Sequence, residues 1–526
     1  MSVSLYDTTL RDGAQQEGIS LSLEDKLKIT LKLDELGVHY IEGGTPGSNP
    51  KDVEYFQKVK ALSLSNAKIT AFGLTRRAGS NVKEDDNIRA LLESGAQIIT
   101  LVAKSSDTQV TEVLETSLEE NLSMIFDSVS YLKERGRTVF LDAEHFFDGY
   151  RSNPDYALKC LSTASEAGAD SLELCDTNGG ALPNEIETAI AEISKRIGKP
   201  LGIHCHDDAD LAVANTLVAV AAGVSNVQGS INGYGERCGN ANLLSIIANL
   251  KLKYNIDCVS DEQLSSLTDV SHYVSEIVNI PPNSSQPYVG ASAFSHKGGL
   301  HASAVAKMED SYQHVSPGKV GNEKRVLISE LSGRSNLEYR IKELGLEKEV
   351  STRQVADLLE NIKVKENKGF QYEVAEASFD LMVMRNLPNY KQPFELVDFM
   401  VVVENRRRSP MDHDNEDMLA EAMVKVRVGQ ELNHTVAEGN GPVNALDNAL
   451  RKALIDHYPS LGQVKLLDYK VRVVDQGHDT QAVVRVLVEC SDGSRQWQTV
   501  GASGNIIEAS WQALSDGLEY FLARKP

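Results

Sequence analysis

The sequence predicts an α/β protein: a (β/α)8 TIM barrel, then helical subdomains and a C-terminal α+β domain. Three observations predict this fold: eight short strand-like runs, helix-like stretches between most of them, and a weak repeat near the C-terminus. A chain of 526 residues is too long for one ordinary core. We therefore expect a large barrel followed by smaller units.

The strand-like runs are rich in β-branched and apolar residues and recur at similar spacing. They are Val3–Tyr6, Tyr40–Glu42, Ile69–Phe72, Ile98–Val102, Val139–Leu141, Ser171–Leu174, Leu201–His204 and Val227–Ile231. After the first run, Ser22 can cap a helix whose apolar residues fall at helical spacing. Alternation of strand and helix eight times predicts a closed parallel barrel over residues 1–258.

The remainder of the chain has a different pattern. Residues 259–371 are mainly helical, with Pro-rich and Gly-rich interruptions, and predict helical linker subdomains. Residues 372–526 predict a C-terminal α+β domain, with a strand over Phe394–Val403 and a polar loop over Glu404–Glu416.

The C-terminal domain contains a weak repeat of a β-β-α unit. Its two copies cover Ala422–Leu454 and Val486–Phe521. Thr435-Val436 aligns with Thr499-Val500, and Ala449-Leu450 aligns with Ala513-Leu514. Two such units predict a pseudo-symmetric module whose helix starts could hold a carboxylate, or a duplication that serves packing alone.

Charge and composition limit the partners. The net charge of −22 argues against binding to nucleic acid or to an anionic membrane. We see no apolar run near the roughly 20 residues of a membrane span and no secretion signal. The six cysteines are scattered without a CxxC pair, which fits reduced thiols. We expect a cytoplasmic protein.

Polar residues gather just after the predicted strands, where a barrel builds its active site. These groups are Arg11-Asp12-Gly13, Glu42-Gly43-Gly44, Glu144-His145, Asp176-Thr177-Asn178, His204-Cys205-His206-Asp207 and Gly235-Glu236-Arg237. Packing alone would not need so many carboxylates and imidazoles at the same strand ends. The pattern predicts an active site at this end of the barrel.

His204 and His206 are candidate metal ligands. They lie two apart after an apolar strand, so both side chains would point the same way. Asp12 closes the first strand, which neighbours the seventh and eighth in a barrel, and would complete an open site for Zn²⁺, Mn²⁺ or Mg²⁺. Asn240 could add an oxygen, directly or through water, or could instead cap a helix.

Further candidates would act on a substrate. Arg11 could polarise a carbonyl or hold oxyanion charge, or could form a surface ion pair. Glu144 and Thr177 could orient an oxo acid; alternatively, Glu144 balances Arg11 and Thr177 caps a turn. His301 and Tyr312 lie beyond the barrel in the chain, and a helical subdomain over its mouth could bring them to a position that needs a general base. A structural role for His301 is the alternative.

Three motifs together resemble the metal-dependent Claisen-condensing barrel family, which includes 2-isopropylmalate, homocitrate and citramalate synthases. The motifs are DTTLRDGAQQEG at Asp7–Gly18, HCHDD at His204–Asp208 and GYGERCGNAN at Gly233–Asn242. The resemblance spans nearly the full chain, because GNGPVNALDNAL looks like the family's regulatory domain. It implies that Asp12, His204 and His206 bind the metal near Asn240. It also implies that Arg11, Glu144 and Thr177 contact the oxo acid, and that His301 and Tyr312 are catalytic.

Within the family, RDGAQQEGISLS and LDAEHFFDGY look most like the citramalate branch, since isopropylmalate synthases usually read RDGEQSPG at the first place. This resemblance implies that acetyl-CoA is joined to pyruvate, that isoleucine is the effector, and that the protein is a homodimer. Alternatives are 2-isopropylmalate synthesis, an acyl-CoA or aldol lyase on the same barrel, a metal hydrolase, and a non-catalytic amino-acid sensor.

Overall fold

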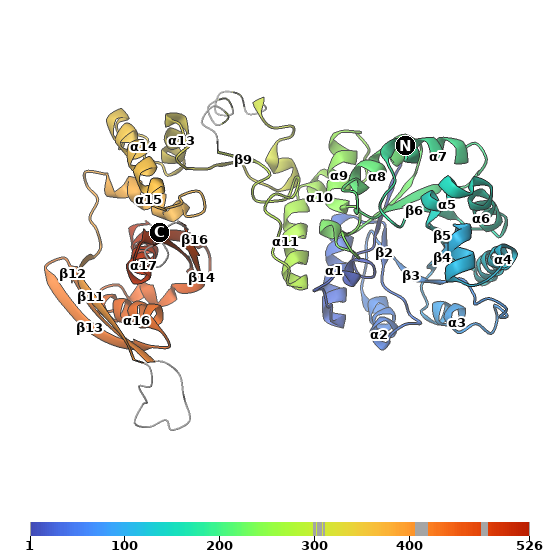
Figure 1. Cartoon of the computed structure of the whole chain (residues 1–526), viewed down its shortest axis with the longest axis horizontal. Helices are drawn as coiled ribbons and strands as arrows, with labels where there is room; N and C mark the ends of the chain where they lie inside the picture. The colour runs from blue at the N-terminus through green and yellow to red at the C-terminus, as the bar shows by residue number, and fades with distance from the viewer. Residues whose placement is uncertain are drawn as a thin grey trace, which may run out of the picture. The chain divides into compact units, whose positions relative to one another are not determined.

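The computed structural model describes residues 2–297, 301, 304, 308, 311–404, 419–474 and 482–524. The chain forms two compact units (Figure 1). The first contains Met1–Phe294 and Val315–Lys324, and the second contains Ser295–His314 and Arg325–Pro526. The division into segments 1–258, 259–371 and 372–526 stays a prediction. The polar loop predicted over Glu404–Glu416 lies outside the described residues, apart from Glu404 itself.

The first unit is a closed barrel of eight parallel strands in sequential order, which confirms the predicted fold class. The strands are β1 (Ser4–Asp7), β2 (Tyr40–Glu42), β3 (Lys68–Leu74), β4 (Ile98–Lys104), β5 (Thr138–Glu144), β6 (Ser171–Asp176), β7 (Leu201–Cys205) and β8 (Asn226–Gly229). The register between β1 and β8 pairs Asp7 with Gly229 and closes the barrel. The eighth strand ends earlier than predicted, because Ile231 already belongs to a short 3₁₀ turn.

Helices surround the strands (Figure 1). They are α1 (Leu23–Leu36), α2 (Pro50–Lys58), α3 (Asp86–Glu93), α4 (Leu118–Glu134), α5 (Phe146–Ser152), α6 (Pro154–Glu166), α7 (Pro183–Ile193), α8 (Ala212–Ala221), α9 (Leu243–Leu252), α10 (Asp261–Leu264) and α11 (Leu267–Val278). Ser22 caps α1 as predicted, since its side chain accepts the N–H of Asp25. No described helix is long and apolar enough to cross a membrane.

The barrel interior holds a buried polar layer below its mouth. The Tyr6 hydroxyl lies 2.8 Å from Glu42 and 2.7 Å from the Thr100 hydroxyl, so it ties three strands together. Glu173 accepts from the Asn226 amide at 2.9 Å. A Cβ at Gly202 would overlap the Glu173 carboxylate, so glycine is what leaves room for that side chain. The barrel therefore encloses carboxyl groups as well as an apolar core.

The second unit contains a helical part and two three-stranded antiparallel sheets. Its elements are β9 (Ser295–His296), β10 (Arg325–Val326), α13 (Arg334–Glu343), α14 (Thr352–Asn367), α15 (Glu376–Arg385), β11 (Glu395–Glu404), β12 (Leu419–Val428), β13 (Glu431–Gly439), α16 (Pro442–Leu454), β14 (Lys465–Val473), β15 (Val484–Ser491), β16 (Gln496–Ser503) and α17 (Ile506–Ala523). The predicted strand over Phe394–Val403 is β11.

The internal repeat exists, but its unit is larger than predicted. Each copy begins with an additional strand, β11 or β14, so the unit is β-β-β-α. The first strands also match: Leu396-Val397-Asp398-Phe399 of β11 corresponds to Leu466-Leu467-Asp468-Tyr469 of β14, and both strands have a register irregularity just before the aspartate. The aligned threonines make equivalent bonds: Thr435 Oγ1 donates to the Ala449 carbonyl at 2.7 Å, and Thr499 Oγ1 donates to the Ala513 carbonyl at 2.7 Å.

Glu173 should make the barrel less stable as pH rises. Burial raises the pKa of Glu173 to about 7, so the folded barrel holds the proton more tightly than the unfolded chain does. The raised pKa stabilises the protonated fold below the unfolded pKa, and this advantage is lost as pH rises toward 7. Relative to wild type, Glu173→Gln should gain about 3 kcal/mol in free energy of unfolding between pH 4 and pH 8. Urea titrations at several pH values would measure this.

Glu93→Gln, on the exposed end of α3, is the matched control and should follow the wild-type pH profile. Glutamine at 173 would add an amide nitrogen that must donate a hydrogen bond. Asn226 Oδ1 has no hydrogen-bond partner among the described residues and can accept it if the Asn226 amide turns. Parallel profiles for wild type and Glu173→Gln would contradict the raised pKa.

Candidate active site

The loop after β1 is fastened to the end of β8. The backbone N–H and hydroxyl of Thr9 both donate to Asp7. The Thr9 oxygen in turn accepts the N–H of Ile231 at 2.8 Å. Thr8 donates to the Gly229 carbonyl at 3.2 Å. The DTT motif is therefore a local clamp that presents the following residues, Arg11 and Asp12, beside the ends of β7 and β8.

Asp12, His204 and His206 come together as the sequence predicted. Their ligand atoms all lie within 4.8 Å of one another, and this group could hold a metal ion. Asp12 Oδ2 lies 3.8 Å from His204 Nε2 and 3.9 Å from His206 Nε2. All three side chains are buried. Two imidazoles and one carboxylate leave coordination positions open for substrate oxygens.

Unpaired polar atoms at this place also fit a cation. Asp12 Oδ1 and Asn240 Oδ1 are buried and have no hydrogen-bond partner within the described part of the chain. The Asn240 amide nitrogen donates to Thr8 at 3.1 Å, which turns its oxygen away from that contact. Asn240 does not cap α9; Asn242 does, by accepting the N–H of Leu244. The capping alternative for Asn240 is therefore wrong.

The protonation states of Asp12, His204 and His206 favour metal binding. Burial raises the pKa of Asp12, but Arg11 and the two imidazoles outweigh burial and hold that pKa below its ordinary value. Burial also lowers the pKa values of His204 and His206. An ionised carboxylate beside neutral imidazoles is the state in which these side chains bind metals.

Arg11 lies in the site and not in a surface ion pair. Its Nε donates to the buried Glu42 carboxylate at 2.6 Å and its Nη1 donates to Asp12 at 3.0 Å. Its guanidinium also stacks 3.9 Å from the centre of the Phe72 ring. These contacts fix the planar group in one orientation at the barrel mouth, and Glu42 and Asp12 raise the Arg11 pKa against the effect of burial.

Glu144 pairs with Lys104, not with Arg11, so that alternative is wrong. Lys104 Nζ lies 2.6 Å from Glu144 Oε2, and the two residues are register partners at the ends of β4 and β5. Thr177 Oγ1 accepts the N–H of His145 at 2.8 Å, which joins the loops after β5 and β6. His145 has a left-handed backbone with φ of 56°. Both candidates thus lie at the ends of neighbouring strands.

His301 and Tyr312 belong to the second unit, apart from the barrel residues in the domain division. Their rings stack with centroids 4.2 Å apart and an interplanar angle of 25°. The structure therefore brings these two predicted residues together. Their catalytic role stays a prediction.

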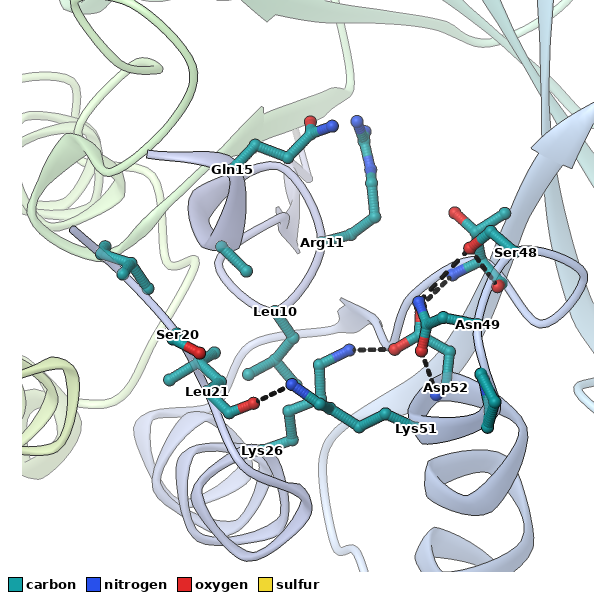
Figure 2. Close-up of a pocket in the computed structure, with 14 residues that line it drawn as sticks. Leu10, Arg11, Gln15, Ser20, Leu21, Lys26, Ser48, Asn49, Lys51 and Asp52 are labelled. Carbon is teal, nitrogen blue, oxygen red and sulfur yellow. Dashed lines mark hydrogen bonds and ion pairs between the residues drawn. The ribbon is translucent and has the colours of Figure 1, made fainter. Parts of the chain in front are cut away.

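A cavity of about 540 Å³ opens between the loop after β1 and the start of α2. Figure 2 shows Arg11 and Gln15 on one side and Ser48, Asn49 and Lys51 on the other. At its base, Lys26 donates to the Asp52 carboxylate at 2.5 Å and to the Gly43 carbonyl at 3.0 Å. This buried pair holds the loop after β2, and the cavity leads away from Arg11.

Comparison with known proteins identifies the family. Residues 2–274 match the HMGL-like family, residues 288–369 match the homocitrate synthase post-HMGL domain-like family, and residues 373–522 match the LeuA allosteric (dimerisation) domain. The chain belongs to the HMGL-like family. The resemblance inferred from the three motifs is thereby confirmed.

Individual relatives match the chain over almost its whole length. An (R)-citramalate synthase of Geobacter sulfurreducens is 53% identical and covers 99% of this chain and 97% of the relative. An (R)-citramalate synthase of Aquifex aeolicus is 49% identical, with coverage of 99% and 98%. A 2-isopropylmalate synthase of Methanocaldococcus jannaschii is 32% identical, with coverage of 99% and 95%.

Sequence reasoning missed several polar residues of this site. Lys104 ends the apolar run IITLVAK, and the rule that polar residues follow barrel strands could have found it. Glu42 was seen among the strand-end residues without its contact to Arg11. Gln228 lies inside β8 and gave no signal, because its contacts depend on cross-strand register.

Metal binding should stabilise the barrel, and the stabilisation should depend on Asp12 and His206. A free Mn²⁺ concentration 100-fold above the Kd stabilises a folded protein by about 2.7 kcal/mol. Asp12→Asn and His206→Ala should lose most of that gain, measured as the shift in urea midpoint with and without Mn²⁺. His272→Ala, on the exposed face of α11, should keep it. Equal stabilisation of wild type and His206→Ala would rule out this ligand set.

Proposed function

We propose that the protein is an (R)-citramalate synthase, an acyltransferase that condenses acetyl-CoA with pyruvate and releases citramalate and CoA. The observation that carries the proposal is full-length similarity to five relatives named (R)-citramalate synthase, at 46% to 53% identity and 99% coverage of this chain. The strand-end groups supply the chemistry that this reaction needs. Isoleucine biosynthesis is the proposed metabolic context.

Asp12, His204 and His206 are the proposed ligands of one divalent metal, Zn²⁺, Mn²⁺ or Mg²⁺, with Asn240 as a further oxygen donor. Imidazole nitrogen suits Zn²⁺, while the carboxylate and amide oxygens also suit Mn²⁺ and Mg²⁺. A bound metal would act as a Lewis acid and polarise the carbonyl group of the oxo acid. The acidic chain needs such local positive charge to hold an anionic substrate, since its net charge is −22.

Arg11 is the proposed stabiliser of the charge that develops on the carbonyl oxygen. Glu42 binds its Nε and Asp12 binds its Nη1, so the guanidinium is held still and little reorganisation is needed when the alkoxide forms. Glu144 and Thr177 are proposed to orient pyruvate by hydrogen bonds. Lys104 holds the Glu144 carboxylate in place, because the two side chains form a close ion pair.

His301, with Tyr312 stacked on its ring, is the proposed general base. It would take a proton from the acetyl methyl group, and the resulting enolate carbon would form a bond to the carbonyl carbon of pyruvate. The pyruvate oxygen then gains a proton, which gives citramalyl-CoA. Water cleaves the thioester and releases citramalate and CoA.

The cavity beside Arg11 is the proposed space for part of acetyl-CoA. A volume of about 540 Å³ lies within the usual range for small-molecule sites. Among the described residues, Arg11 is the one proposed reacting group in its lining, which also includes Gln15 and Lys51 (Figure 2). A thioester that enters through it would arrive next to Arg11.

A 2-isopropylmalate synthase is the second candidate, because one full-length relative at 32% identity carries that name. Both activities would use the same ligands and Arg11, and they differ in the size of the acceptor. Discrimination of one methylene in a pocket is worth only about 1–3 kcal/mol. The acceptor must therefore be measured directly.

The deciding experiment is CoA release from acetyl-CoA, with pyruvate, 2-oxobutanoate, 2-oxoisovalerate or 2-oxoglutarate offered separately. We expect strong preference for pyruvate, loss of activity with a chelator, and recovery when metal is added. Arg11→Gln should lower kcat by about 10²- to 10³-fold, the usual cost of removing one oxyanion donor. Arg135→Gln, at the exposed end of α4, is the control. Preference for 2-oxoisovalerate would favour the second candidate, and no release with any acceptor would refute both.

The second unit is proposed to form a homodimer that isoleucine regulates. The match to the LeuA allosteric (dimerisation) domain over residues 373–522 suggests dimerisation. The first strands of the two repeats expose apolar side chains that a monomer would leave in water. Met400 of β11 is 53% exposed and Val471 of β14 is 44% exposed. A second copy would cover such strands.

Met400→Glu with Val471→Glu should convert the dimer to a monomer, because charges would be buried at the interface. The same double variant should lose inhibition by isoleucine while CoA release without isoleucine remains. Light scattering after size exclusion measures the mass, and CoA release with isoleucine, leucine or valine measures the effector. Phe126→Glu, at a 43% exposed site on α4, is the matched control. An unchanged mass for the double variant would refute the interface.

A further inference from the structure

A buried chain of hydrogen bonds leads from one histidine of the metal group into the barrel core. His204 Nδ1 lies 2.9 Å from Gln228 Oε1. The other end of that amide, Gln228 Nε2, donates to Asp142 Oδ1 at 3.0 Å. Gln228 is 0% exposed, and His204 and Asp142 are also buried. These hydrogen bonds join β7, β8 and β5 beneath the mouth of the barrel.

The two ends of the amide decide which nitrogen of His204 carries the proton. Asp142 accepts from the amide nitrogen, so the amide oxygen is the end that faces the imidazole. An oxygen can only accept, and therefore Nδ1 must carry the hydrogen. The Nε2 lone pair is then free on the side that faces Asp12, 3.8 Å away.

We propose that Gln228, held by Asp142, is a positioning residue that fixes His204 in the Nδ1-protonated tautomer and so prepares Nε2 to bind the metal. This inference rests on the metal site of the proposed function and adds two residues outside its ligand set. Groups that accept the second N–H of a ligating histidine fix the ring and make it a better donor.

The two histidines differ in this support. His206 Nδ1 is buried but has no hydrogen-bond partner among the residues that the structure describes. His206 follows β7, whereas His204 lies within it and faces Gln228 through the β7–β8 register. His204 is therefore the ligand whose orientation is set before metal arrives.

Asp142 also connects these hydrogen bonds to the strand that carries Glu144, a proposed substrate contact. It lies on β5 two residues before Glu144, and it is the register partner of Glu173 on β6. An aliphatic residue at 228 would free Asp142 and leave His204 Nδ1 without an acceptor. The imidazole could then turn or exchange tautomers, and metal affinity would fall.

Gln228→Leu tests the proposal by competition of Mn²⁺ or Zn²⁺ with a chelating dye. We expect affinity about 10- to 100-fold weaker than wild type, the usual cost of losing such a partner. Asn226→Leu is the matched control. It removes a buried amide two residues earlier on the same strand, where the partner is Glu173 and no ligand is touched. Equal loss in both variants, or none in Gln228→Leu, would overturn the proposal.

Nitrogen NMR of histidine-labelled wild-type protein without metal gives a second test that needs no stable variant at 228. The His204 resonance, assigned by its absence in His204→Asn, should show a protonated Nδ1 and a bare Nε2. A protonated Nε2 would overturn the proposal. If the wild-type protein bound no divalent metal, the metal site would be refuted. The NMR measurement would still test whether Gln228 fixes the tautomer of His204.

Discussion

The closure of the barrel between β1 and β8 is the constraint on which the site depends. It brings Asp12, near the start of the chain, within 4 Å of imidazole nitrogens that follow almost two hundred residues later. The Asp7–Thr9–Ile231 clamp makes this closure specific, because it fixes the loop that carries Arg11 and Asp12. A register shift at this seam would separate the ligands, since they are carried at the ends of neighbouring strands.

The pKa values of the buried carboxyl groups differ between the deep interior of the barrel and its mouth. Deep in the barrel, burial raises the pKa values of Asp142 and Glu173, so low polarity favours their neutral forms. At the mouth, Arg11 and the imidazoles reverse that effect for Asp12, whose pKa is lowered. One barrel therefore holds hydrogen-bonding carboxyl groups below and an ionised carboxylate above. Arg11, which Glu42 anchors, makes the largest contribution to lowering the pKa of Asp12 at the mouth.

Much of this could be predicted from the sequence, because strands and their polar ends are local patterns. The HCH spacing predicted two imidazoles on one side, and alternation of strands and helices predicted that Asp12 would be near. The sequence did not reveal the Lys104–Glu144 pair, or the contact of Gln228 with His204, since both depend on which residues of neighbouring strands share a register. The strand β14 was missed because Lys470 and Arg472 interrupt the apolar run that marks β11, although Leu466, Asp468 and Tyr469 match residues of that strand.

The equivalent threonine bonds show why the repeat kept those positions. Thr435 and Thr499 lie on the last strands and bind carbonyls of α16 and α17, so each copy fastens its helix to its sheet in the same way. The first strands contact α17 as well, since Phe399 of β11 stacks on Trp511 and the Tyr469 hydroxyl of β14 lies 2.7 Å from the Ser510 hydroxyl. They also carry exposed apolar residues in both copies. Both first strands are sheet edges, so each presents an unpaired backbone edge beside its exposed apolar side chains. A twofold interface would bring such a surface against the same surface of a second copy. Leu396, Asp398 and Phe399 recur as Leu466, Asp468 and Tyr469, so the similarity of the two copies extends to the first strands. The repeated unit is therefore all three strands and the helix, and the aromatic residue of each first strand serves the same contact with α17.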